Sequence, residues 1–182
     1  LGSGAGGSET EAVLRQRRSA VRRIFEDLML DERVVALFCS RDDYANLRLI
    51  LRRVLTDKPL GTDFSPEGNV PPEQLRQAFE AQDYSTLPPY LEAAAEQAVL
   101  AYYQNKDLRQ IDQAVDRAQA QHRLETARNT DGRVFLTNLF RLQADLTNLR
   151  TLLRVKHLQA DPRDAFLPGG FVEMDQIGRA HV

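Results

Sequence analysis

The stretch DYANLRLILR, residues 43–52, returns with small changes as DLTNLRTLLR, residues 145–154. Both copies follow the pattern D-x-x-N-L-R-x-x-L-R, and the offset between them is 102 residues. The same offset carries a downstream turn, P-x-G-x-V, from Pro66, Gly68 and Val70 onto Pro168, Gly170 and Val172. Chance seldom keeps both a helix pattern and a following turn in one register. The repeat therefore predicts an internal structural duplication.

Each copy has the periodicity of an amphipathic helix. At about 100° per residue, the apolar residues of each copy share one face, and an Asp and an Asn lie at the margin of that face. In the first copy these residues are Leu47, Ile50, Leu51 and Val54, with Asp43 and Asn46; in the second they are Leu149, Leu152 and Leu153, with Asp145 and Asn148. We expect the two helices to occupy equivalent places in the fold.

The polar residues of the repeat allow two interpretations. Asp43, Asn46, Asp145 and Asn148 are expected to cap or hydrogen-bond neighbouring helices, since buried polar groups usually have partners. The arginines Arg48, Arg52, Arg150 and Arg154 lie four residues apart on the other face of each helix. They are either solvated or salt-bridged, or they dock an acidic partner, for which rows of guanidinium groups are well suited.

The remaining chain is also helical in its apolar spacing. Helices are expected from Val13 to Leu28, through the first copy to Thr56, and over residues 72–81, 91–106, 107–127 and 133–158. Loops rich in Pro and Gly follow both copies, and no window shows the sustained alternation of a strand. The predicted fold class is all-α, built from helical repeats.

Composition narrows the classes of function. The 182 residues are 42% hydrophobic and 27% charged, with a formal net charge of -2. This is the range of a soluble globular protein, and it gives no overall basic field for nucleic acid. The single Cys39 forms no internal disulfide and suits a reducing compartment. No apolar run approaches the length of a membrane span.

Both ends of the sequence are unusual. The chain starts with Leu1 and the string GSGAGGS, and its last six residues, IGRAHV, match the translation of a common sequencing adapter. We expect a truncated reading frame. The predicted organisation is a flexible or artefactual start (1–10), the end of a first helical repeat with its Pro/Gly loop (11–75), a second repeat (76–176) and an adapter-derived tail (177–182).

A search for catalytic chemistry finds little. His122, His157 and His181 are scattered, and no phosphate-loop, zinc-protease or nucleophile-elbow motif is present. Asp112 and Asp116 lie one helical turn apart, but His122 is far round the same helix, so a solvated acidic face is favoured over a metal site. Cys39 is expected in buried packing, and Gly169 with Gly170 in a turn. The sequence predicts no enzyme, no cofactor and no metal.

The order of several motifs carries a family resemblance. DYANLRLILRRV, SPEGNVPPEQL, IDQAVDRA and DLTNLRTLLRVKHL, followed by FLPGGFV, resemble the C subunit of the V-type (V/A-type) ATPases, which is related to the eukaryotic d subunit. The resemblance covers about residues 11–176. Members of that family are all-helical funnels of three related repeats, so the resemblance implies that about one and a half repeats are present here.

The resemblance also implies a function without chemistry. Family members are non-catalytic central-stalk components that connect the central shaft, formed by the D and F subunits, to the membrane proteolipid ring in proton or sodium transport. They lie peripherally at the cytoplasmic face of the membrane. Arg48, Arg52, Arg150 and Arg154 are the candidate docking residues, and Asp43, Asn46, Gly68, Asp145, Asn148 and Gly170 form the structural motif.

Two rival functions stay open. The first is a helical module that binds nucleic acid or protein through the basic stretch from Arg15 to Arg23. The acidic balance elsewhere argues against nucleic acid. The second is an all-helical enzyme with a cofactor in the bundle core, which would normally show inward Glu and His at i, i+3 spacing. No Glu lies three residues before a His in the sequence.

Overall fold

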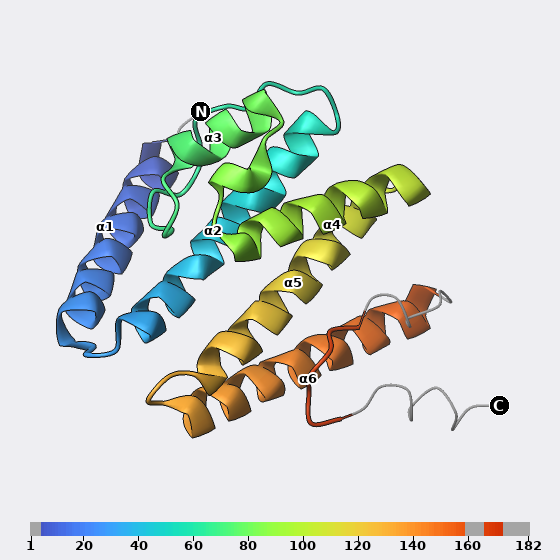
Figure 1. The fold of residues 1–182 in the computed structure, drawn as a ribbon. Helices are drawn as coiled ribbons and strands as arrows, with labels where there is room; N and C mark the ends of the chain where they lie inside the picture. Colours follow the sequence, from blue (N-terminus) through green and yellow to red (C-terminus); the bar gives the residue numbers. More distant parts are fainter. Residues whose placement is uncertain (1–4, 159–165, 173–182) are drawn as a thin grey trace.

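A computed structural model describes residues 5–158 and 166–172 of the chain. This part holds six α-helices and no strand (Figure 1). The helices are α1 (Ala5–Leu28), α2 (Glu32–Val54), α3 (Pro72–Ala81), α4 (Pro89–Asn105), α5 (Leu108–Arg128) and α6 (Arg133–Leu158), with a 3-10 turn η1 (Tyr84–Thr86) before α4. The predicted all-α class is confirmed.

Local sequence signals place the helix starts. Asp31 and Asp107 precede α2 and α5, and each side chain accepts a hydrogen bond from the backbone N–H two residues on, as N-cap residues do. Pro72 and Pro89 open α3 and α4, where the missing N–H of proline costs nothing. α4 ends at Asn105, and the next residue, Lys106, has the left-handed conformation common after a helix.

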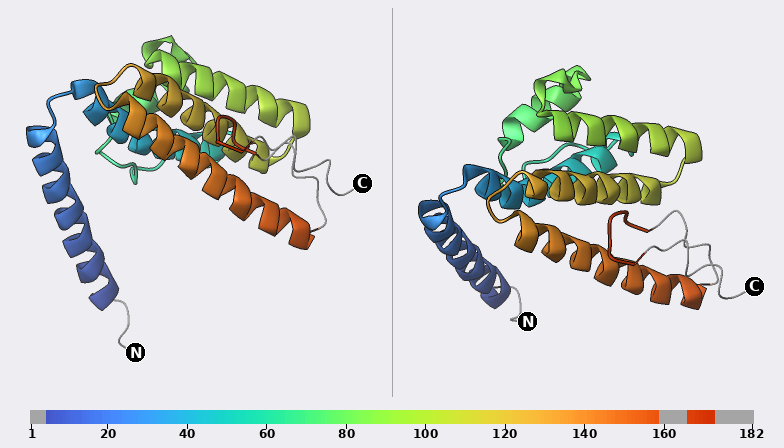
Figure 2. Two further views of the ribbon diagram at one scale, coloured as in Figure 1. Left: turned by 90° about the horizontal axis from the view of Figure 1, so that it is seen from below. Right: turned by 60° about the horizontal axis from the view of Figure 1, so that its bottom comes forward.

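The helix α5 lies at the centre of the arrangement. It packs against α4, α2 and α6, whereas α1 contacts α2 only sparsely. Figure 1 shows α5 between α4 and α6. In both views of Figure 2, α1 extends away from the other helices and α6 lies along an edge of the molecule. Each copy of the repeated pattern thus has a different set of neighbours.

Two hydrophobic clusters hold the helices together. The larger cluster joins α2, α3, α4 and α5, and its fully buried members include Leu47, Ile50, Leu51, Ile111 and Val115. The smaller cluster joins α2, α5 and α6 through Val34, Leu37, Leu124, Ala127, Leu136 and Phe140. Burying such side chains contributes about 1.5–3 kcal/mol each, so the first copy of the pattern is the most strongly anchored part of the fold.

The apolar faces of the two copies differ. Leu47 and Leu51 have no exposed surface, because α4 and α5 cover this face of α2. The equivalent Leu149 and Leu153 of α6 are 52% and 62% exposed. Within residues 5–158 and 166–172, no helix covers that face of α6. The sequence led us to expect equivalent places for the two helices, but their apolar faces have different surroundings.

The predicted organisation into repeats stays a prediction. Part of the start expected to be flexible or artefactual, residues 1–10, belongs to α1, which begins at Ala5. The boundary expected between residues 75 and 76 falls inside α3, so the division into repeats stays a proposal. Residues 177–182 lie outside the described part of the chain.

Candidate functional site

The carboxylate of Asp43 fastens α2 to the loop that follows it. Its Oδ1 accepts a hydrogen bond from Val70 N at 2.9 Å. Its Oδ2 accepts from Asn69 Nδ2 at 2.8 Å and from the Tyr90 hydroxyl at 2.7 Å. Burial and this hydrogen bond to the carboxylate raise the pKa of Tyr90. Asp43 is 1% exposed, so its negative charge is held by these donors rather than by water.

Asp145 holds the equivalent loop after α6. Its Oδ2 accepts from Phe171 N at 3.0 Å and its Oδ1 from Val172 N at 3.2 Å. Val172 is the residue that the repeat aligns with Val70. The two Asp side chains of the motif therefore make the same bond to the same position of their loops.

The Asn of the motif forms a second matched contact. Asn46 Nδ2 donates to the carbonyl of Ser65 and its Oδ1 accepts from Ser65 N, both at 2.8 Å. Asn148 makes the same pair of bonds with Leu167, at 2.9 and 2.7 Å. We expected the Asp and Asn side chains to cap or hydrogen-bond neighbouring helices. Asp43 does so through Tyr90 of α4, whereas both Asn side chains hold loops, because each helix is followed by a chain reversal that returns beside it.

Gly68 and Gly170 lie where the loop passes close to the Asp carboxylate. A Cβ atom at Gly68 would stand 2.1 Å from Asp43 Oδ1, and one at Gly170 would stand 2.0 Å from Asp145 Oδ1. Only glycine allows this approach without displacement of the carboxylate. We call the Asp, Asn and Gly of each copy, together with the loop that they hold, the polar clamp.

The arginines of the first copy are neutralised inside the protein. Arg48 forms a hydrogen-bonded ion pair with Asp116, and Arg52 forms one with Asp112. Both acids lie on α5. The sequence favoured a solvated acidic face at this place, and the structure pairs both acids with arginines while their side chains stay partly exposed. The arginines also do not lie opposite the apolar stripe. They flank it, since Arg48 is one residue and about 100° beyond Leu47.

The arginines of the second copy have different surroundings. Arg150 and Arg154 are exposed, and neither forms an ion pair with the residues that the structure describes. Among the described residues, the arginines of the two copies therefore have different surroundings. The cause is that α5 faces Arg48 and Arg52, while no described helix stands in that place beside α6. Their docking role stays a prediction.

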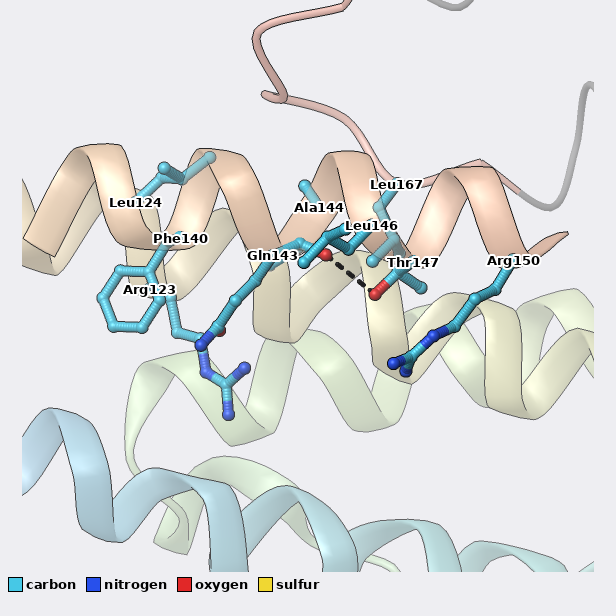
Figure 3. A pocket seen from close by; sticks show the side chains of 10 residues that line it. Arg123, Leu124, Phe140, Gln143, Ala144, Leu146, Thr147, Arg150 and Leu167 are labelled. Atoms are coloured by element: carbon cyan, nitrogen blue, oxygen red, sulfur yellow. Dashed lines mark hydrogen bonds between the residues drawn. The ribbon is translucent and has the colours of Figure 1, made fainter. Parts of the chain in front are cut away.

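A cavity of about 280 Å³ lies between α5, α6 and Leu167. Its polar side chains come from Arg123 of α5 and from Gln143, Thr147 and Arg150 of α6 (Figure 3). Burial and the charge of nearby Arg41 lower the pKa of Arg123. Sequence reasoning missed Arg123, because it belongs to no repeated motif and only the packing of α5 against α6 makes it line the same cavity as Arg150.

The other candidate chemical groups are structural. His122 stacks on the Tyr90 ring with 4.2 Å between centroids, and burial lowers its pKa. Cys39 is a buried free thiol, as predicted. The searched residues, which are those that the structure describes, contain no group of three or more His, Cys, Asp or Glu side chains able to hold a metal ion. Asp112 and Asp116 are engaged by arginines.

The basic stretch of α1 is partly neutralised. Arg22 lies 3.0 Å from Glu26, 3.5 Å from Asp42 and 3.2 Å from Glu67. Ser19 also donates to Glu67, so this side of α1 faces the loop that follows α2. The internal pairing removes Arg22 from any basic patch and weakens the alternative function in nucleic-acid binding.

These contacts define an all-α scaffold in which the repeated Asp and Asn side chains hold the loops that follow α2 and α6. The comparisons identify its family: residues 2–180 match the family described as ATP synthase (C/AC39) subunit, and the chain belongs to it. The predicted resemblance is confirmed.

Two relatives come from strains of Thermus thermophilus, and both are named as the C subunit of a V-type ATP synthase. Each is 29% identical over 152 residues, which is 80% of this chain and 46% of the relative. The chain thus spans about half the length of the curated relatives that it matches. No solved structure matches it. In the described part of the chain, every helix is too short or too polar to cross a membrane.

Proposed function

We propose that this chain is part of a non-catalytic central-stalk (rotor) subunit of a V/A-type ATPase or ATP synthase. In this role it connects the central shaft to the membrane proteolipid ring during proton or sodium transport. It acts peripherally, at the cytoplasmic face of the membrane. The observation that carries the proposal is the family match over residues 2–180, joined to the V-type names of both relatives.

The repeated polar clamp suits a part that transmits torque. A coupling element must not bend when its two ends are loaded in opposite directions. Each clamp ties a long helix to the loop that follows it by hydrogen bonds to backbone groups, in both copies. Charged acceptors make such bonds comparatively strong. The scaffold therefore resists shear between helix and loop at two places along its length.

The docking surface that we propose includes Arg150 and Arg154. Arg48 and Arg52 already pair with carboxylates of α5, and their charges are compensated within the protein. Arg150 and Arg154 are exposed, so their guanidinium groups are open to a partner. Exposed arginines favour association with an acidic surface and control its rate. The partners proposed are the D and F subunits of the central shaft and the proteolipid ring.

Binding to the purified D and F subunits of the shaft tests this proposal. We expect the unmodified chain to bind them. The double variant Arg150→Glu/Arg154→Glu should keep the fold and bind at least about tenfold more weakly. Arg128→Glu, an exposed change near the end of α5, is the matched control and should bind normally. In the assembled complex, the double variant should uncouple ATP hydrolysis from ion pumping. If the unmodified chain does not bind the D and F subunits, the rotor assignment is refuted.

A further inference from the structure

The cavity between α5 and α6 carries positive charge at both ends. Arg123 and Phe140 lie at one end, and Thr147 and Arg150 lie at the other. The lining also includes the apolar side chains of Leu124, Ala144 and Leu167, with the polar side chain of Gln143 among them. In Figure 3, the Arg123 and Arg150 side chains extend to the same side of the α5–α6 pair, with Gln143 beside Arg123. Two guanidinium groups therefore face one elongated space.

Arg123 has no carboxylate partner among the residues that the structure describes. It is half-buried, and no hydrogen bond or ion pair joins it to an acid of this part of the chain. Its guanidinium lies 5.7 Å from the centroid of the Phe140 ring, which fixes its direction. Asp116 acts on it only through space, because that carboxylate is bonded to Arg48. A partly buried cation without an acid is costly unless an anion joins it.

One neutral polar side chain of the cavity also fits an anion. The Thr147 hydroxyl is not that group, because it already donates its proton to the backbone carbonyl of Gln143 at 2.9 Å. The side-chain amide of Gln143 supplies N–H donors at the cavity. Among the residues that the structure describes, no Asp or Glu lines the cavity, so none of these wall residues repels a carboxylate.

We propose that this cavity binds a dicarboxylate, with one carboxylate on Arg123 and the other on Arg150. The two ends are marked on α6 by Phe140 and Thr147, which are seven residues or about 10 Å apart along a helix. A single phosphate is too short to bridge that span, whereas two carboxylates joined by an apolar spacer reach both cations across the apolar wall. Guanidinium groups bind carboxylates through paired hydrogen bonds.

The two carboxylates have two possible sources with the same chemistry. One is a free aliphatic diacid, and the other is a protein segment with two acidic side chains about 10 Å apart, such as glutamates seven residues apart on a helix. The proposal does not rest on the rotor assignment, because it concerns the chain alone. A titration of the chain with defined probes therefore tests it separately.

The first experiment titrates the isotope-labelled chain at constant ionic strength and follows the arginine side-chain N–H signals. The probes are glutarate, adipate, suberate, butyrate and inorganic phosphate, and an alanine-rich helical peptide with glutamates seven residues apart. We expect affinity to rise with spacer length, with adipate or suberate binding at least about tenfold more tightly than butyrate or phosphate. A peptide that binds more tightly than every diacid identifies a protein segment as the source; the reverse order identifies a free diacid.

The second experiment uses three matched variants. Arg123→Gln and Arg150→Gln should each reduce suberate affinity about tenfold, to the level of butyrate, which is the loss of one of two contacts. Arg128→Gln, outside the cavity, should bind as the unmodified chain does. Melting curves of each variant show whether it is folded. Equal affinity for all probes, or an equal loss in Arg128→Gln, would overturn the proposal.

Discussion

Asp43 and Asp145 each offer Oδ1 to the backbone N–H of an equivalent valine, at 2.9 Å for Val70 and 3.2 Å for Val172. The two carboxylates are 102 residues apart in the chain. The match extends to the glycine in each loop, where a Cβ atom would stand 2.1 or 2.0 Å from the same oxygen. The repeated pattern therefore encodes one local structure twice, in which a helix binds its own following loop.

Alanine at the clamp glycines should destabilise the fold. Gly68→Ala and Gly170→Ala each place a methyl group against an Asp carboxylate, and the expected cost is about 1–3 kcal/mol of unfolding free energy. Gly132→Ala is the matched control, because its Cβ meets only Leu136, at 3.4 Å. Urea denaturation measures all three variants. Equal stability of Gly68→Ala and Gly132→Ala would show that the loop moves aside freely.

Charge reversal at the equivalent arginines of the two copies should have different effects on stability. Arg52→Glu places a carboxylate beside Asp112 and should lower the unfolding free energy by about 1 kcal/mol, a modest value because the pair is partly exposed. Arg154→Glu, at the equivalent position of α6, should stay within about 0.5 kcal/mol of the unmodified chain. Thermal melting distinguishes them. Adding Asp112→Lys to Arg52→Glu should recover part of the loss.

Alanine substitution of equivalent leucines in the two copies should also have different effects on stability. Leu51→Ala removes a fully buried side chain and should cost about 2–5 kcal/mol, whereas Leu153→Ala should cost less than about 1 kcal/mol. Leu153 and Leu149 belong to an exposed apolar stripe on α6 with Leu142 and Leu146. Serine at Leu149 and Leu153 should therefore reduce binding of a hydrophobic fluorescent dye. Unchanged dye fluorescence would mean that this stripe is covered in solution.

Acid should weaken the attachment of α1. Hydrogen bonds from Ser19 and Arg22 lower the pKa of Glu67 below its ordinary value. A carboxyl group whose folded pKa is depressed stabilises the fold above its unfolded pKa of about 4.3, and this stabilisation is lost as pH falls through the lower, folded value. Solvent screening limits the effect to no more than about 1 kcal/mol.

The variant Glu67→Gln tests this pH dependence. At pH 6 it should be less stable than the unmodified chain, and the difference in unfolding free energy should shrink towards zero near pH 3. Glu80→Gln serves as a control, because Glu80 pairs with Arg76 within α3 and does not reach α1. A difference that stays constant from pH 6 to pH 3 would show that the ionised carboxylate is not what holds α1.

The sequence by itself determined the helices and the duplication. Apolar spacing located all six helices, because a helix that packs against others must place apolar residues on one face. The shared offset identified Asp43, Asn46 and Gly68 with Asp145, Asn148 and Gly170, because each clamp lies within one short segment and depends on local geometry. Motif order was also sufficient to identify the family.

Only the tertiary structure decided which copy of the pattern is covered. Arg48 and Arg150 occupy the same position in nearly identical segments, yet Arg48 pairs with Asp116 while Arg150 faces a cavity. No sequence motif indicated that Arg123 lines that cavity. The physical reason is that burial and charge pairing depend on distant residues. A local pattern specifies the shape of its own helix, but the helices that pack beside it determine what each side chain contacts.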